Sequence, residues 1–118
     1  MQSMQLLVFI MRKIDNLPVV LSRYMDAGIS GTTILDCEGA LQVLGQNSVD
    51  QPPIFGSLRS YLNPSHESRK MLLTVLSDEQ LPVAKQIIRD VVDIDRPDTG
   101  IMFTLPLTSV EGLAKKTK

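Results

Sequence analysis

Few side chains in this sequence could do covalent or metal chemistry. The chain has one histidine, His66, one cysteine, Cys37, and no tryptophan. A single cysteine excludes a disulfide framework and a zinc-finger arrangement, and no nucleophile stands with a base in a pattern typical of catalysis. Cys37 falls in a β-branched segment and is expected to pack there as a small apolar residue. The sequence therefore predicts no catalytic residue, no metal site and no enzymatic activity.

Three carboxylates, Asp93, Asp95 and Asp98, stand close together in the sequence. They lack the glycine and the distal glutamate of an EF-hand calcium loop. We therefore expect them to form a turn before the last apolar segment.

Four residues could hold an anion. Arg96, Thr99 and Gly100 could form a small anion-binding nest, and a plain turn before a strand is the alternative. Lys13 follows an apolar run and could face a phosphate, and a solvated charge at the end of a strand is the alternative for this residue. The sequence leaves both alternatives open.

The composition is that of one globular domain spanning residues 1–118. Hydrophobic residues make up 43% of the chain and charged residues 21%, and the formal net charge is −1. Such a chain has neither the basic surface nor the aromatic platform that nucleic-acid binding needs. The longest apolar run, Leu6 to Met11, is too short to cross a bilayer or to form a signal peptide. We expect a cytoplasmic protein that is not itself a membrane protein and binds no nucleic acid.

Hydrophobic patterning predicts the order strand, helix, strand, a long gap, strand, helix, strand. The expected strands are residues 5–11, 31–38, 69–76 and 101–107. This order predicts an α+β, ferredoxin-like βαββαβ fold with a four-stranded antiparallel sheet and two helices on one face. The other face needs a cover that so short a chain cannot supply, so we expect its subunits to associate.

The ends of the two helices carry recognisable signals. Asp15 is expected to cap the first helix at its N-terminus, and Gly28 is expected to end it. Ser77 and Gln80 match a capping box at the start of the second helix.

The gap between the second and third strands is the most informative segment. Gly39 to Ser68 is much longer than an ordinary connection, and only Asp50, Arg59 and Glu67 in it are charged. A short amphipathic stretch inside it predicts a docking element for a protein partner, and packing against its own or a neighbouring subunit is the alternative. The side chains expected to make this contact are Ile54, Phe55, Leu58, Arg59, Tyr61 and Leu62.

The segment from Gly28 to Gly39 resembles the end of the first helix and the second strand of the PII nitrogen-regulatory signal proteins. It has the sequence Gly-Ile-Ser-Gly-Thr-Thr-Ile-Leu-Asp-Cys-Glu-Gly, and the family's pattern is close to Gly-Ile-Thr-Gly-Met-Thr-Val-Thr-Glu-Val-Lys-Gly. Ser77-Asp-Glu-Gln80 and Asp98-Thr-Gly-Ile-Met-Phe103 match the start of the second helix and the last core strand. The resemblance therefore extends across the chain.

The resemblance implies a homotrimer whose sheets line a central core. It also implies that the long connection, about residues 39–68, is a T-loop that reaches target enzymes and transporters. ATP or ADP, with 2-oxoglutarate as co-ligand, would bind in the cleft between subunits and reset this loop. The positions near such a nucleotide would be Met11, Gly31, Thr32, Thr33 and Gly39.

The chain departs from the family in the residues that hold phosphates. The family has Thr-Gly-x-Ile-Gly-Asp-Gly-Lys before the last strand, whereas this chain has Ile94-Asp-Arg-Pro-Asp-Thr-Gly-Ile101, without the lysine. The family's arginine pair after that strand is absent from Thr108 to Leu113. An adenine nucleotide could then bind only at a divergent site, whose residues would include Lys13, Arg96, Thr99 and Gly100.

Two functions fit these observations. The first is a PII-like regulator that senses a small-molecule effector at its subunit clefts. Such a regulator would control a membrane transporter or a metabolic enzyme through the loop at residues 39–68. The alternative is a ligand-free structural or interaction module in which this loop is fixed in an oligomer interface.

Overall fold

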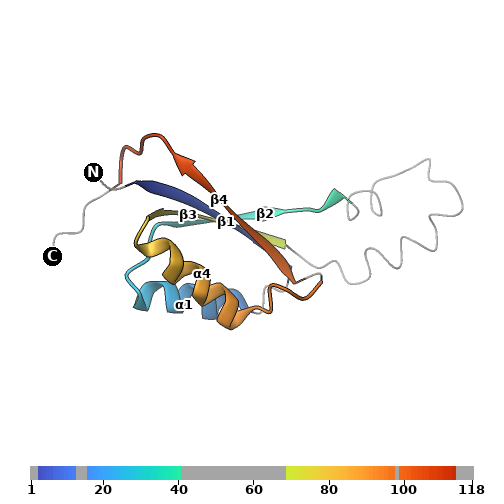
Figure 1. The fold of residues 1–118 in the computed structure, drawn as a ribbon. Coiled ribbons are helices and arrows are strands. Elements are labelled where there is room, and N and C mark those ends of the chain that lie inside the picture. The colour runs from blue at the N-terminus through green and yellow to red at the C-terminus, as the bar shows by residue number, and fades with distance from the viewer. Residues whose placement is uncertain (1–2, 13–15, 41–68, 98, 114–118) are drawn as a thin grey trace, which may run out of the picture.

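One antiparallel sheet carries two helices on one of its faces. The computed structural model describes residues 3–12, 16–40, 69–97 and 99–113. The elements in chain order are β1 (Met4–Met11), α1 (Leu17–Asp26), β2 (Thr32–Cys37), β3 (Arg69–Ser77), α4 (Gln80–Val91) and β4 (Gly100–Leu107). Both helices lie on the same side of the sheet (Figure 1). The predicted α+β, ferredoxin-like fold is confirmed.

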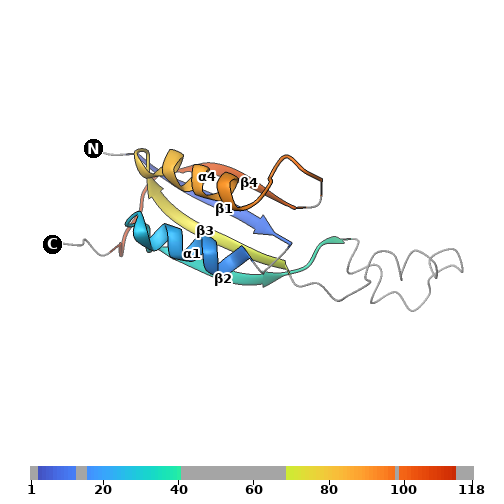
Figure 2. The same cartoon turned by 90° about the horizontal axis from the view of Figure 1, so that it is seen from below.

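The strand order of the sheet is β2-β3-β1-β4, with every neighbouring pair antiparallel. The strand with the longest apolar run, β1, therefore lies at the centre of the sheet beside β3, where both faces of a strand can be covered. Seen from the helix side, α1 lies over the β2–β3 half and α4 over the β1–β4 half (Figure 2). Within the described residues, no helix lies on the opposite face of the four strands.

The core lies between the helices and the sheet. Alternate residues of β1 point into it, because successive side chains of a strand face opposite sides. The side chains of the core cluster are Leu7, Phe9, Met11, Val20, Tyr24, Ile29, Leu72, Leu76, Ala84, Ile88 and Val92. Val8 is also buried but belongs to the other face, in register with Leu73 of β3 and Phe103 of β4.

The two sequence signals for helix ends that fall in the described residues are both confirmed. Gly28 has a φ of +80°, and the N–H groups of Gly28 and Ile29 donate to the carbonyls of Met25 and Tyr24, which is a Schellman end. Asn16 precedes α1 and makes no side-chain capping bond, while the expected cap, Asp15, lies outside the described residues. Gly28 thus turns the chain from α1 into β2 as expected.

The predicted capping box before α4 is confirmed. The Gln80 backbone N–H donates to the Ser77 hydroxyl at 3.2 Å, and the Ser77 N–H donates to Gln80 Oε1 at 3.1 Å. These bonds satisfy backbone donors that the first turn of a helix leaves without partners. The box joins the end of β3 directly to the start of α4.

Tyr24 brings a polar atom into the core beneath α1. Its hydroxyl is buried, with no hydrogen-bond partner at bonding geometry among the described residues. Burial raises the pKa of Tyr24 to about 12, and the Thr74 hydroxyl offsets only part of this rise. Thr74 shares a 3.0 Å hydrogen bond with the hydroxyl of Thr32, which ties β3 to β2.

Tyr24 should make the fold sensitive to alkali. A tyrosine in the unfolded chain ionises near pH 10, but burial keeps Tyr24 protonated to about pH 12. Stability is therefore lost as the pH rises from about 10 to about 12, by at most about 3 kcal/mol. Tyr24→Phe should remove this loss, and Tyr61→Phe should retain it. Urea unfolding between pH 8 and 11.5 tests this, and equal alkaline losses in the two variants would contradict it.

Candidate functional site

Four strand termini lie together at one end of the sheet. We call this end, which runs across the strands, the edge. β1 and β2 end there, and β3 and β4 begin there. One row of paired residues at this edge runs Asp36, Lys70, Met11 and Gly100 across the four strands. Lys70 forms an ion pair with Asp36. The connection between β2 and β3 begins and ends at this edge. We therefore take the edge as the candidate functional site.

The side chain of Arg69, the first residue of β3, lies close to Gly39, two residues beyond the end of β2. A Cβ atom built on Gly39 would lie 2.4 Å from a guanidinium nitrogen of Arg69. The guanidinium therefore lies against the Gly39 backbone. This contact and the Asp36–Lys70 ion pair lie side by side where the connection begins and ends. Sequence patterns do not reveal the contact, because it depends on the register of β2 and β3.

The structure separates the predicted nucleotide positions within one chain. Met11, Gly39, Thr99 and Gly100 lie at the edge just described. Gly31, Thr32 and Thr33 lie at the other end of β2, since Thr32 pairs with Thr74 and Cys37 pairs with Arg69. Five residues of strand span roughly 17 Å. A single site that includes both groups therefore needs two subunits.

The side chains of two of these positions already have structural roles. Met11 is 1% exposed and packs in the core, so its side chain does not face a cleft. The Thr32 hydroxyl is bonded to Thr74. Thr33 and Gly31 are exposed.

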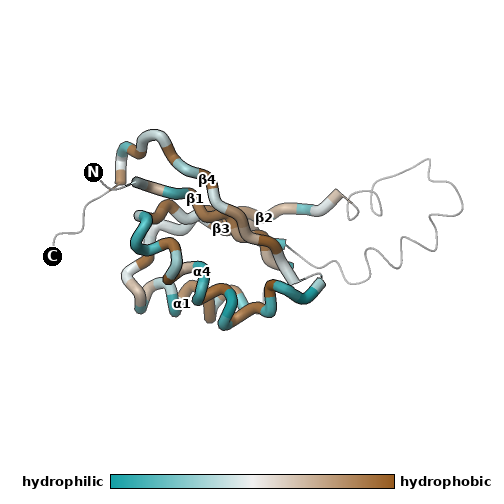
Figure 3. Tube along the Cα trace, in the orientation of Figure 1, coloured by the Kyte–Doolittle hydropathy of each residue, from teal (hydrophilic) through white to brown (hydrophobic). Residues whose placement is uncertain are grey.

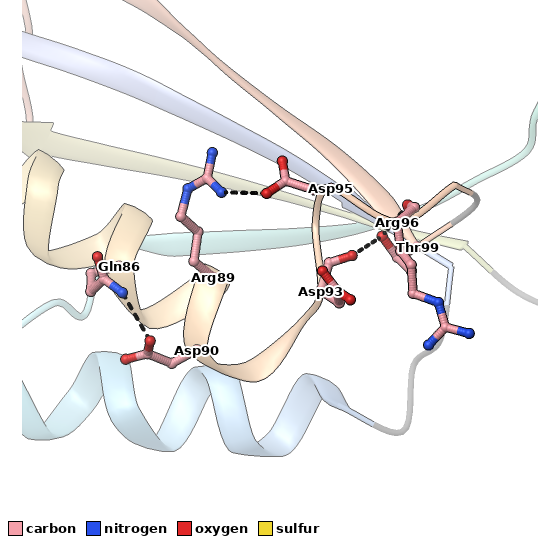
Figure 4. Close-up of polar contacts among 7 residues, drawn as sticks. All are labelled: Gln86, Arg89, Asp90, Asp93, Asp95, Arg96 and Thr99. Carbon is pink, nitrogen blue, oxygen red and sulfur yellow. Dashed lines mark hydrogen bonds and ion pairs between the residues drawn. The ribbon is translucent and has the colours of Figure 1, made fainter.

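The turn between α4 and β4 is held by its own hydrogen bonds (Figure 4). The Thr99 hydroxyl lies 2.7 Å from the Asp93 carbonyl oxygen, to which it donates, and 3.0 Å from that of Arg96. The Arg96 N–H also donates to the Asp93 carbonyl. The Arg96 guanidinium points away from the Asp93–Thr99 contact. The Thr99 hydroxyl and the Arg96 guanidinium therefore do not point toward one common position.

A salt bridge anchors the turn to α4. Arg89, in the last turn of the helix, lies 3.2 Å from a carboxylate oxygen of Asp95. The third carboxylate of the segment, Asp98, lies outside the described residues. The geometry of Asp93 and Asp95 is that of a turn, as the spacing predicted.

Gly100 allows β4 to pack closely against β1. A Cβ atom at this position would lie 2.8 Å from the Ile10 carbonyl oxygen and 3.1 Å from the Phe9 ring. Real Cβ atoms do not approach a backbone oxygen so closely, so a side chain would push the two strands apart. Packing of the sheet is therefore sufficient to explain glycine here.

Gly100→Ala should lower the free energy of unfolding by about 1–3 kcal/mol, because backbone must move to admit the methyl group. Gly31→Ala is the matched control, since a Cβ atom there has nothing within 4 Å. It should change stability by less than about 0.5 kcal/mol. Chemical denaturation of both variants measures this, and wild-type stability of Gly100→Ala would show that β4 is not closely packed.

The helix-free face of the sheet is an apolar surface, which we call the open sheet face. Its exposed side chains include Leu35 at 43%, Ile101 at 56%, Phe103 at 44% and Leu105 at 45%. Figure 3 shows hydrophobic residues along the strands. The residues of this face, as the register places them, are Leu6, Val8, Ile10, Leu35, Met71, Leu73, Val75, Ile101, Phe103 and Leu105.

Several predicted site residues lie outside the described part of the chain. These are Lys13 and the expected docking side chains Ile54, Phe55, Leu58, Arg59, Tyr61 and Leu62. In the part of the chain that the structure describes, no three histidine, cysteine, aspartate or glutamate side chains gather as a metal site would require. Within the same residues, no helix has the length and hydrophobicity needed to span a membrane.

Comparison with solved structures decides the fold family. No family model and no curated protein matches the sequence. The structure of PII from Arabidopsis thaliana bound to citrate matches with a TM-score of 0.59 and 16% identity, over 89% of this chain and 78% of that one. The chain has a PII-like fold.

A second solved structure has the same PII-like arrangement. It is a functionally unknown protein from Pediococcus pentosaceus, which matches with a TM-score of 0.64 over 96% of this chain and 100% of that one. Its sequence identity is 12%. The likeness therefore lies in the backbone, and in a PII-like fold the edge with the β2–β3 connection is the natural place to look for function.

Proposed function

We propose that this chain is a PII-like regulatory protein that works as a homotrimer in the cytoplasm. It senses a small molecule in the clefts between subunits and controls a protein partner through the connection at residues 39–68. It catalyses no reaction. The observation that carries the proposal is a PII-like fold whose open sheet face is apolar and whose longest connection leaves from one edge.

The open sheet face supports the trimer. A sheet that is apolar on both sides needs a layer on each of them, and α1 and α4 cover only one. Exposed Ile101, Phe103 and Leu105 stand on β4, with Leu35 across the sheet on β2. Three copies arranged about an axis would cover these faces mutually, with no further chain.

The separation of the predicted ligand positions supports a cleft between subunits. Gly31 and Thr33 lie at one end of the sheet, and Gly39 lies at the other. Residues of two copies must meet for both ends to contact one small molecule. The Arabidopsis PII structure is bound to citrate, which supports a small-molecule effector for a protein of this fold.

The effector acts on the partner through the ends of the connection. Gly39 and Arg69 touch at its base, beside the Asp36–Lys70 ion pair. A ligand that binds one arrangement of this base more tightly shifts the connection toward that arrangement. The partner, a membrane transporter or a metabolic enzyme, then binds one state of the connection and not the other.

The same contacts favour a second candidate function. If Arg69 and the Asp36–Lys70 pair fix the connection permanently, the chain is a ligand-free interaction module whose loop belongs to an oligomer interface. No metabolite would then change the melting temperature of the protein, whereas an effector of the regulator would raise it.

Phe103→Asp should break the trimer, because a carboxylate in an apolar interface loses its hydration without gaining a partner. Met25→Asp is the matched control, since Met25 is 64% exposed on α1, in the helix layer. Light scattering coupled to gel filtration should show a lower mass for Phe103→Asp alone, with circular dichroism verifying that both variants fold. An unchanged mass for folded Phe103→Asp would contradict a trimer built on this face.

Phe55→Ala should weaken capture of the partner by about tenfold or more and leave the trimer intact, because an aromatic anchor dominates a small docking surface. The assay crosslinks the tagged protein in its own cell extract, identifies the partner by mass spectrometry, and repeats capture with purified partner. Ser57→Ala, a polar change in the same segment, is the control. Equal capture by the wild type and Phe55→Ala would exclude docking through this side chain.

A further inference from the structure

We infer that the turn between α4 and β4 does not hold a phosphate chain, so that the effector of the proposed subunit cleft is not recognised through phosphates. This inference rests on the proposed function, because it concerns the ligand of that cleft. A nucleotide is the ligand that the fold would suggest, and the described residues of this turn fit its phosphates poorly in charge and in hydrogen bonding.

The electrostatic field at the turn is unfavourable for a phosphate. Phosphate sites use the N-terminus of a helix, where the dipole is positive, but here the C-terminus of α4 leads into the turn. Exposed Asp93 and Asp95 follow directly, and Arg89 is already paired with Asp95. The negative end of a helix and two exposed carboxylates therefore lie at this turn.

The nearby cations do not reverse this field. Arg96 belongs to the turn, and Arg12 is close, since its backbone N–H lies 3.4 Å from the Thr99 carbonyl. Of the described cations, Arg89 is already paired with Asp95, and the Arg96 guanidinium points away from the Asp93–Thr99 contact. A phosphate chain carries several negative charges and needs an excess of cations or N–H donors to replace its water.

The hydroxyl of the turn is already engaged. A hydroxyl has one hydrogen to donate, and that of Thr99 is directed to the Asp93 carbonyl at 2.7 Å, with the Arg96 carbonyl at 3.0 Å. If Thr99 turned its hydroxyl to a phosphate, the turn would lose this bond. The Arg96 N–H is engaged by the same Asp93 carbonyl.

Close packing of β4 against β1 explains the glycine at the end of the turn, Gly100, without a ligand. Anion nests need successive N–H groups in alternating right- and left-handed conformations. The glycines with positive φ in the described residues are Gly28 and Gly112, both outside this turn. Gly100 is the first residue of β4, and the space of its missing side chain is filled by Ile10 and Phe9.

Isothermal titration of the full chain tests the inference, with ATP, adenosine and inorganic triphosphate as probes, each with and without Mg²⁺. We expect ATP to bind no more than about threefold tighter than adenosine, and triphosphate to give no saturable heat up to about 1 mM. The absence of binding by all three probes would equally support the inference. ATP binding about tenfold or more tighter than adenosine, or saturable triphosphate binding, would overturn it.

A pair of variants separates repulsion by the turn from simple loss of contacts. A double variant that carries Asp93→Asn and Asp95→Asn should bind ATP more tightly than the wild type does. The control variant Asp26→Asn, on α1, should bind ATP as the wild type does. A fall in ATP affinity in the double variant would contradict the inference.

The mass of the same samples distinguishes this inference from the proposed function. A trimer with no phosphate-dependent binding agrees with both. A trimer that recognises phosphates overturns the inference alone, and a monomer overturns the proposed function whatever the titration shows.

Discussion

The structure depends on one constraint, which is that a four-stranded sheet has two apolar faces and the described residues supply helices for one of them. The apolar residues of β1 alternate between the core, as with Phe9, and the open sheet face, as with Val8. Burial of apolar area is the main favourable term in folding and in association. The same strands therefore build the core on one face and leave an apolar surface on the other, and the proposed trimer would bury that surface.

The sheet also determines where function is possible. Its antiparallel order brings the ends of β1 and β2 and the starts of β3 and β4 to one edge, from which the longest connection departs. At that edge Arg69 lies on Gly39, and Lys70 pairs with Asp36. These are the groups through which a ligand in a neighbouring cleft would act on the connection. The turn before β4 lies at the same edge, but its hydrogen bonds and its ion pair connect residues of the turn and α4 to one another.

Much of the fold could be predicted from the sequence. Periodicity indicated the element order, and the Schellman glycine and the capping box are short-range signals whose bonds involve neighbouring residues only. The long apolar run of β1 indicated a central strand, and β1 does lie between β3 and β4. Expected strand bounds differ from the observed ones by about one residue, as with Met4 and Ser77, because strand ends depend on pairing partners.

The site could be predicted much less well. Packing of Gly100 against Ile10 and of Arg69 against Gly39 requires the register between strands, which local patterns leave undetermined. Sequence resemblance grouped Gly31 with Gly39 as ligand positions, although one chain holds them at opposite ends of β2. Under the proposed function, a second copy would bring the two groups of positions together in one cleft.

Sedimentation equilibrium of the unmodified chain over a wide concentration range tests this account most directly. If the open sheet faces cover one another, the protein should sediment as a single species of three times the 13.1 kDa chain mass. A chain that stays at 13.1 kDa at every concentration would contradict the account, because its apolar face would then remain in water.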